Sequence, residues 1–164
     1  MGRTVIEITV TKKGAPDQVF KDVRPAINAA MEAAIEHWHA GMLKRHFEGG
    51  AEQRYGYKPR TKKYLVRKLR VKGHNLPLVW SGTLRTSVLR RIELRSLKSR
   101  PEATGRMKAP RYVYMTPSLM YKHHLAKEIV TTTADEAAEL AKVTDDEATR
   151  ILNEVNKVET VRLT

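Results

Sequence analysis

The sequence predicts an α+β fold in which one long helix packs on a small antiparallel sheet and the acidic C-terminal part is helical. Alternating apolar and polar residues from Thr4 to Thr11 indicate a half-buried strand. From Val19 to Phe47, apolar residues recur with a three-to-four spacing that gives one apolar stripe, which is typical of an amphipathic helix. With 164 residues and no low-complexity segment, the chain is expected to form a single domain, residues 1–164.

Two further strands are expected in the second half of the chain. Val88–Leu97 alternates between apolar and polar residues, and Met107–Met115 follows as another strand after a loop at Lys98–Gly105. Proline has no backbone N–H to donate, so Pro110 predicts that the later strand lies at a sheet edge or carries a bulge. The two strands are expected to pair as a hairpin.

The long helix is expected to run from Pro25 to Glu48. Proline is tolerated in the first turn of a helix but disrupts its interior, so Pro25 marks the start, and a short helical turn can precede it. Gly49 and Gly50 end the helix. Trp38 lies on the apolar stripe and is predicted to be a core anchor. A stripe of this length needs a sheet or neighbouring subunits to cover it.

Capping boxes mark helix starts in the acidic tail, residues 128–164. Thr133–Glu136 and Thr144–Glu147 each place a glutamate three residues after a threonine, so that each side chain can satisfy the other residue's backbone N–H. Each box is therefore expected to begin a helix. Val158–Leu163 alternates weakly and is a candidate last strand, whereas Ser118–Lys127 does not favour one type of element.

The formal net charge of +13 is unevenly distributed. The net charge is zero over residues 1–43 and +16 over residues 44–111. It is +2 over residues 112–127 and −5 over residues 128–164. Such asymmetry indicates a polyanionic partner or an acidic surface on another subunit. A head-to-tail contact in a ring could use both regions of one chain.

A basic loop and helix, residues 51–76, is expected to project from the domain. Its first ten residues are interpreted as a loop because of their glycine and proline. Thr61 can then cap a helix that runs to about Val71. Lysines in the first turn oppose the helix dipole, so this helix should be poorly stable alone. We expect it to be mobile or to be held by a partner.

The segment Pro77–Val88, PLVWSGTLRTSV, joins a short apolar run, a Ser-Gly turn and an amphipathic piece. Leu78, Trp80 and Leu84 are the large apolar residues of an otherwise polar stretch. Together with Trp38, these three side chains are predicted to anchor the chain to its core.

The histidines do not have the spacing of a metal site. His39 and His46 would share one face of the long helix, but His37 and His39 would not face each other. There is no HExxH motif and no cysteine to complete a structural zinc site. Packed or solvent-facing histidines are the preferred interpretation, and no metal is expected.

No catalytic constellation is apparent in the sequence. Ser81 lacks the first glycine of a GxSxG nucleophile motif, and no glycine-rich loop has the lysine and spacing of a P-loop. The clustered carboxylates lie at expected helix starts, where negative charge is favourable. We therefore expect no enzyme activity and no cofactor. Because no apolar run approaches membrane-spanning length, no membrane partner is expected either.

The basic segment is the strongest functional signal. Its cations, predicted to contact a partner or DNA, are Lys58, Arg60, Lys62, Lys63, Arg67, Lys68, Arg70 and Lys72. Interleaved tyrosines add stacking or hydroxyl contacts, as in phosphate-backbone binding. Our first hypothesis is a contact with the acidic region of a neighbouring subunit, residues 133–159. Duplex DNA is the second, and no sequence-specific DNA-binding signature is present.

PLVWSGTLRTSV resembles the SG-x-L-x-x-S segment of phage neck and tail-completion proteins, a group that includes the phage virion morphogenesis proteins. The resemblance covers most of the chain in order. It includes the opening strand, a long helix ending in HFEGG, the stretch YGYKPRTKKYLVRK, the strand RYVYMTP and an acidic helical C-terminus. MYKHHLAKE stands where such proteins have YA-x-x-x-E-x-G, and the basic helix is more highly charged. Neck, tail-completion and connector proteins therefore all remain open as the subfamily.

The resemblance implies a structural virion component of the phage head–tail junction, assembled in the host cytoplasm. Such proteins form rings that join the head to the tail or complete the tail, and they bring no catalytic residues to carry over. The implied partners are other copies in a homo-oligomeric ring, neighbouring connector, neck or tail proteins, and double-stranded DNA in the channel. The alternative function is a basic nucleic-acid-binding module without sequence-specific readout.

Overall fold

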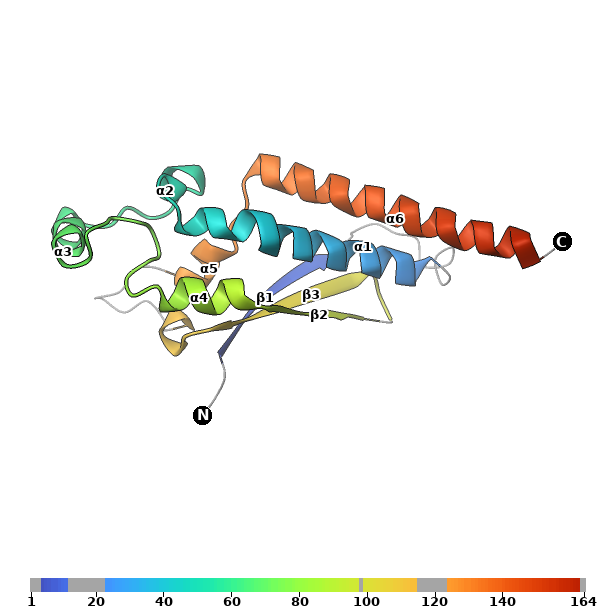
Figure 1. The fold of residues 1–164 in the computed structure, drawn as a ribbon, viewed down its shortest axis with the longest axis horizontal. Helices are drawn as coiled ribbons and strands as arrows, with labels where there is room; N and C mark the ends of the chain where they lie inside the picture. The colour runs from blue at the N-terminus through green and yellow to red at the C-terminus, as the bar shows by residue number, and fades with distance from the viewer. Residues whose placement is uncertain (1–3, 12–22, 98, 115–123, 163–164) are drawn as a thin grey trace.

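Three antiparallel strands and a long helical run form the framework of the protein (Figure 1). The computed structural model describes residues 4–11, 23–97, 99–114 and 124–162. The strands are β1 (Thr4–Thr11), β2 (Ile92–Ser96) and β3 (Glu102–Ala109), arranged in the order β1-β3-β2. The expected α+β fold with a small antiparallel sheet and a long helix is confirmed.

The central strand β3 differs from its prediction. It begins at Glu102, within the expected loop, and ends at Ala109, directly before Pro110. Proline therefore terminates the strand instead of lying in it, which explains how β3 pairs on both sides and is not an edge strand. The predicted hairpin is present, because β2 pairs with β3. Residues Arg111–Tyr114, expected to be strand, form the 3-10 helix η3.

A glycine in β3 allows the sheet to approach the helix closely. Ala103, Gly105 and Met107 alternate with more exposed residues and form the buried face of this strand. A Cβ on Gly105 would lie 2.6 Å from Ile35 Cγ2 and 2.6 Å from Ile92 Cδ1, closer than real Cβ contacts. Any larger side chain would push helix and sheet apart, so glycine is required by packing at this position.

The helical run Arg24–Phe47 is continuous but changes its winding. It comprises α1 (Arg24–His37), the π-helical η1 (Trp38–Met42) and the 3-10 helix η2 (Leu43–Phe47). The start close to Pro25 agrees with the prediction, and the turn expected before it lies outside the described residues. The apolar stripe faces the sheet, with its central residues buried. Trp38 lies in this core, as predicted for an anchor.

Residues 51–60 are not wholly a loop. Ala51–Arg54 forms the short helix α2, which follows Gly50 in the left-handed region at φ 84°. Tyr55 and Tyr57 are buried beside Ala51 in a small cluster. The projecting part of the chain therefore begins after Tyr57, not at residue 51.

The helices that follow are α3 (Lys62–Lys72) and α4 (Thr83–Arg90). The strand predicted from Val88 is shortened, because Val88–Arg90 completes α4 and β2 begins only at Ile92. Leu84 and Val88 are both buried. Because they lie four positions apart, they share one face of α4, and this face packs against the core.

The acidic tail forms one helix after α5 (Leu125–Ile129). The helix α6 spans Ala134–Arg162, so the two predicted helices are a single one of 29 residues. Thr144 lies inside it and donates its hydroxyl to Leu140 O, 2.8 Å away, instead of capping a helix. The candidate strand Val158–Leu163 is also wrong, since α6 continues to Arg162.

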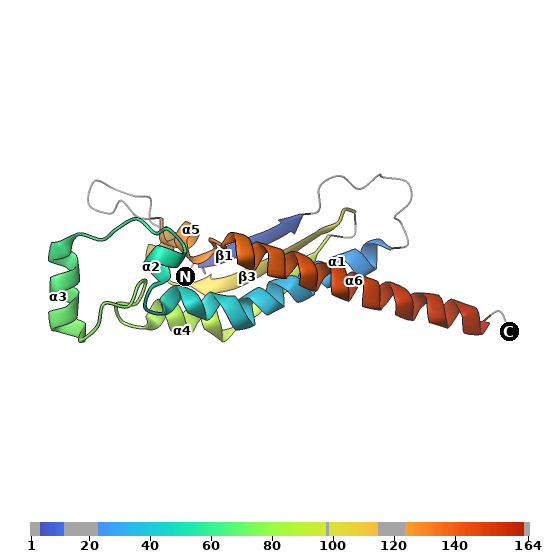
Figure 2. The ribbon, with the colours of Figure 1, turned by 90° about the horizontal axis from the view of Figure 1, so that it is seen from above.

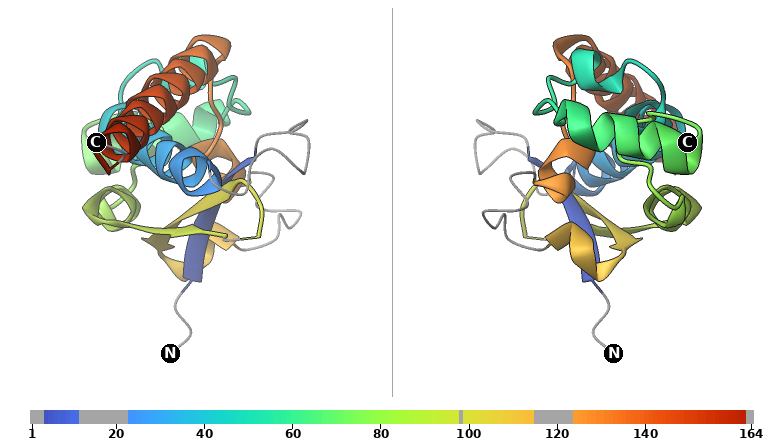
Figure 3. Two further views of the ribbon diagram at one scale, coloured as in Figure 1. Left: turned by 90° about the vertical axis from the view of Figure 1, so that its right-hand side faces the viewer. Right: turned by 90° about the vertical axis from the view of Figure 1, so that its left-hand side faces the viewer.

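The elements form three layers along an elongated molecule. The run α1–η2 packs on the sheet, and α6 crosses α1 on the side away from the sheet (Figure 3). The helix α3 lies at one end of the long axis, joined to the body by two extended connections. The C-terminal part of α6 reaches beyond the sheet at the other end (Figures 1 and 2).

Candidate interaction surface

Local signals explain why α3 forms despite its like charges. Thr61 Oγ1 accepts a hydrogen bond from Tyr64 N at 3.3 Å, which satisfies a free donor of the first turn. Gly73 ends the helix in the left-handed conformation at φ 72° and donates its N–H to Leu69 O. The predicted cap and helix are therefore confirmed, with the end one residue beyond Val71.

Two of the cations predicted to contact a partner face the protein interior instead. Lys68 is 2% exposed and its ammonium donates to Leu76 O; burial lowers its pKa. Arg60 forms a bidentate pair with Glu128 at 3.0 and 2.6 Å, and both side chains are largely covered. Arg60 thus fastens the projecting segment to α5, whereas Lys68 ties α3 to the connection that follows it. The prediction of a partner contact is wrong for Lys68, and Arg60 already has an internal partner.

The other cations of the segment lie on the surface. Lys58, Lys62, Lys63, Arg67, Arg70 and Lys72 are all exposed. Among them lie three exposed apolar side chains, Val66 at 59%, Leu69 at 51% and Val71 at 56%. The helix thus buries a lysine and exposes aliphatic residues, the reverse of the usual preference. A surface of this composition is typical of an interaction site.

Trp80 belongs to this surface and not to the core. Its side chain is 38% exposed, which contradicts its prediction as a core anchor. Tyr64 packs on it with ring centroids 5.8 Å apart, and Arg67 and Lys72 lie 6.0 and 5.7 Å from its ring. These cation–π contacts hold α3 against the connection that follows it. A recess of about 260 Å³ lies between α3, the connection that follows it and the adjoining body of the protein, where Tyr112 and Leu125 line it.

The other predicted anchors lie inside. Leu84 is buried, and Leu78 packs against the core while remaining partly exposed. Leu78 adopts φ 55°, a left-handed conformation that is uncommon for a bulky residue. Gly82, at φ 80°, turns the chain into α4, and Ser81 Oγ lies 2.9 Å from Thr83 Oγ1. The Ser-Gly turn thus orients the start of α4 so that Leu84 enters the core.

A buried polar cluster connects the long helical run to α2. His46 stacks on Tyr55 with ring centroids 3.8 Å apart and hydrogen-bonds the Tyr57 hydroxyl through Nδ1. Burial lowers the pKa of His46 to about 4, although the nearby Glu136 carboxylate opposes the shift. Burial also raises the pKa of Tyr57. His46 is therefore neutral at physiological pH.

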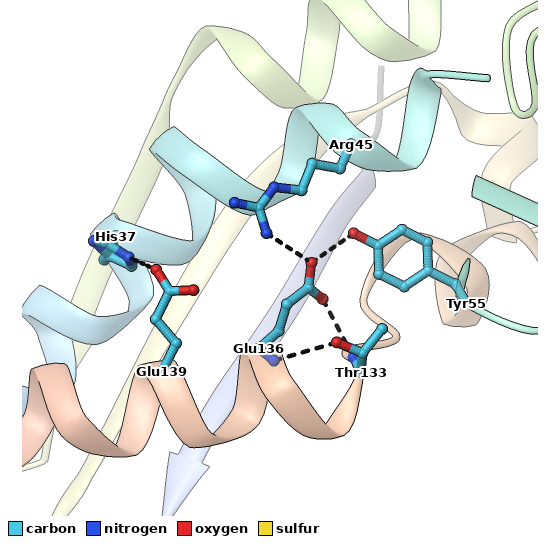
Figure 4. A network of polar contacts seen from close by, with 6 residues as sticks. All are labelled: His37, Arg45, Tyr55, Thr133, Glu136 and Glu139. Carbon is cyan, nitrogen blue, oxygen red and sulfur yellow. Dashed lines mark hydrogen bonds and ion pairs between the residues drawn. The ribbon is translucent and has the colours of Figure 1, made fainter. Parts of the chain in front are cut away.

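Glu136 joins α6 to this cluster (Figure 4). Its carboxylate accepts hydrogen bonds from the Tyr55 hydroxyl at 2.7 Å, Arg45 Nη1 at 3.3 Å and Thr133 N at 3.2 Å. Burial, together with the bond to Glu136, raises the pKa of Tyr55 to about 12. Glu136 N donates to Thr133 Oγ1, which confirms the first capping box. His37 and Glu139 add an exposed pair at 2.8 Å.

These polar contacts join α6, α2 and the long helical run to one another. In the described part of the chain, no group of three His, Cys, Asp or Glu side chains has the arrangement of a metal site. His39 donates to Val88 O at 2.8 Å, which ties η1 to α4. Within the same residues, no helix is long and apolar enough to cross a membrane. The sequence could not indicate the Tyr55–Glu136 or Arg60–Glu128 contacts, because their partners are distant in the chain.

No protein-family model, curated protein or solved structure matches this chain significantly.

Proposed function

We propose that the protein is a structural, non-catalytic subunit of a phage head–tail junction, where copies form a ring that joins or completes the tail. The observation that carries the proposal is the arrangement of charge along the molecule. The cationic α3 lies at one end, and the acidic α6 extends towards the other (Figure 2). A subunit with unlike surfaces at its two ends is suited to head-to-tail assembly.

The resemblance of Pro77–Val88 to phage neck and tail-completion proteins supports the same role. In this chain the SG-x-L-x-x-S residues have a structural task, since the turn at Gly82 directs Leu84 into the core. The segment also presents Trp80 against α3. The segment therefore holds α3 in a defined position relative to the body. A subunit that contacts its neighbours in a ring through α3 needs such a fixed position.

A deletion of the gene in a phage that encodes it tests this function. We expect electron micrographs of lysates to show separate heads and tails, with joined particles restored when the wild-type protein is supplied in trans. Purified particles should contain the chain in several copies. Normal yields of infectious, tailed particles from the deletion would contradict the proposal.

The second candidate function is nucleic-acid binding without sequence-specific readout. The observation in its favour is the exposed cationic face of α3 with Tyr64 and Trp80 beside it. Cations and aromatic rings together suit phosphate and base contacts. However, Arg67 and Lys72 already lie against Trp80, which leaves less of its ring open to stacking.

A further inference from the structure

We propose that the outward face of α3 binds the helix α6 of a second copy of the chain. This contact rests on the proposed function, because it supplies the link between neighbouring subunits of the ring. It also specifies which two surfaces meet, which residues form the contact, and which charge reversals should break and restore it.

The outward face of α3 combines charge with apolar surface. Lys62, Val66, Leu69 and Arg70 follow a spacing of three to four residues and therefore share one side of the helix. All four are exposed, whereas Lys68 on the opposite side is buried and bonds to Leu76 O. Residues 58–72 contain eight cations and no acidic residue, so no carboxylate of the same segment neutralises the positive charge of this face.

The complementary surface is α6. Residues 134–162, which form α6, contain eight acidic and four basic residues. Asp135, Asp145 and Asp146 are exposed along α6, and the exposed Glu139 and Glu154 pair with His37 and Arg150 of the same chain. Alanines between them, such as Ala141, offer small apolar contacts to Val66 and Leu69. Opposite charge around an apolar centre favours one register of two helices and disfavours like-charged partners.

The two surfaces of one copy are separated along the long axis of the molecule. The helix α3 lies at one end of the long axis, and α6 runs from the body towards the opposite end (Figures 1 and 2). Each copy can therefore offer α3 to one neighbour and α6 to another, as a ring requires. Every copy of the chain carries one α3 and one acidic α6, so each α3 can find one α6 on another copy. We therefore infer that a second copy is the partner.

Reciprocal charge reversal tests the contact in the purified full chain. We expect Lys62→Glu with Arg70→Glu, and separately Asp145→Lys with Asp146→Lys, each to weaken self-association at least about tenfold in analytical ultracentrifugation. Chains that carry all four changes should self-associate again, as should an equimolar mixture of the two double variants. In the fourfold variant the two reversed surfaces again carry opposite charge, and in the mixture each α3 meets an α6 of opposite charge.

The matched control reverses two exposed cations elsewhere, Arg85→Glu on α4 with Arg95→Glu on β2. It lowers the net charge as much as the α3 double variant does, and we expect it to leave self-association within about twofold of wild type. Double variants that weaken association without restoration in the fourfold variant or the mixture would overturn the proposal. So would a control as damaging as the α3 variant, since total charge would then explain the effect.

Cysteine cross-linking provides a measurement that does not depend on charge. The chain has no cysteine, so pairs of introduced thiols report one contact each. Mixing Val66→Cys protein with Ala141→Cys or Thr149→Cys protein and a short bis-maleimide should yield mixed dimers. Val66→Cys with Ser96→Cys on β2 should yield at least about fivefold less, since association places α3 near α6 and not near β2. Equal cross-linking to both sites would overturn the proposal.

The failures of the two proposals are distinguishable. If charge reversal abolishes self-association and its restoration works, but the gene deletion leaves phage particles normal, then the contact stands and the junction function fails. If deletion separates heads from tails while both double variants self-associate and complement normally, then the junction function stands and the α3–α6 contact fails.

Discussion

The two tryptophans occupy opposite environments, and their replacement should have unequal effects. Trp38 is buried in the main core, whereas Trp80 is partly exposed beside α3. We expect Trp38→Ala to lower the free energy of unfolding by about 3–5 kcal/mol, because it leaves a cavity in the core. Trp80→Ala should cost about 1 kcal/mol, mainly through its contacts with Tyr64 and the cations. Urea denaturation followed by circular dichroism measures both values, and equal losses would contradict this assignment.

His46 should make stability depend on pH. Burial depresses its pKa from 6.5 to about 4 in the folded chain, so the folded state keeps it neutral over that interval. As the pH falls from 6.5 towards 4, the unfolded chain binds a proton at His46 that the folded chain does not bind. The free energy of unfolding therefore falls with decreasing pH in this window, by up to about 3 kcal/mol in total.

The variant His46→Gln isolates this contribution from the other titrating groups. At pH 7.5 it should be less stable than wild type, because it loses the stacking on Tyr55. The difference should shrink towards pH 4.5, since only the wild type loses stability through this proton. Denaturation midpoints at four or five pH values are sufficient. A stability difference that stays constant with pH would show that His46 titrates normally.

At the scale of elements, the two threonines of the predicted capping boxes share one sequence pattern but have different structural roles. Thr133 caps α6, whereas Thr144 lies within it. We expect Thr133→Ala to cost about 1 kcal/mol, because it removes a cap, and Thr144→Ala to change stability by less than about 0.5 kcal/mol. Thermal unfolding of both variants makes the comparison. A larger loss for Thr144→Ala would mean that α6 is interrupted there.

The same pair shows which features of the fold the sequence can predict. Both threonines have the same local pattern, so the pattern alone cannot tell a helix start from a helix interior. Residues 134–162 contain neither glycine nor proline to stop the first helix, and this continuity decides the outcome. Pro110 was misassigned for a related reason: its missing donor is tolerated equally at a sheet edge and just after a strand.

The candidate surface was predictable in position but not in orientation. Thr61 and Gly73 are local signals, and they define α3 from sequence alone. The burial of Lys68 depends on Leu76 O, which only the folded connection places within reach. Arg60 is likewise withdrawn by Glu128, far away in the sequence. These tertiary contacts of Lys68 and Arg60 therefore determine that only the other predicted cations are exposed to a partner.

At the scale of the whole molecule, a net charge of +13 predicts weak binding to any polyanion at low salt. Binding of duplex DNA by the purified chain is therefore not informative by itself. The informative quantity is the slope of the logarithm of affinity against the logarithm of salt concentration, about −0.9 for each phosphate that is neutralised. Comparing this slope between variants reveals which cations contact phosphates.

We expect that replacing Lys62, Lys63, Arg67 and Arg70 with serine changes this slope by less than about one, because a second copy covers the face that carries Lys62 and Arg70, and Arg67 lies against Trp80. Fluorescence anisotropy with a labelled duplex, at several salt concentrations and above the self-association threshold, measures the slope. The variant with Arg85, Arg90, Arg91 and Arg95 changed to serine removes equal charge from α4, β2 and the residue between them. A reduction of about three or four confined to the α3 variant would place its cations on phosphates and favour nucleic-acid binding as the function.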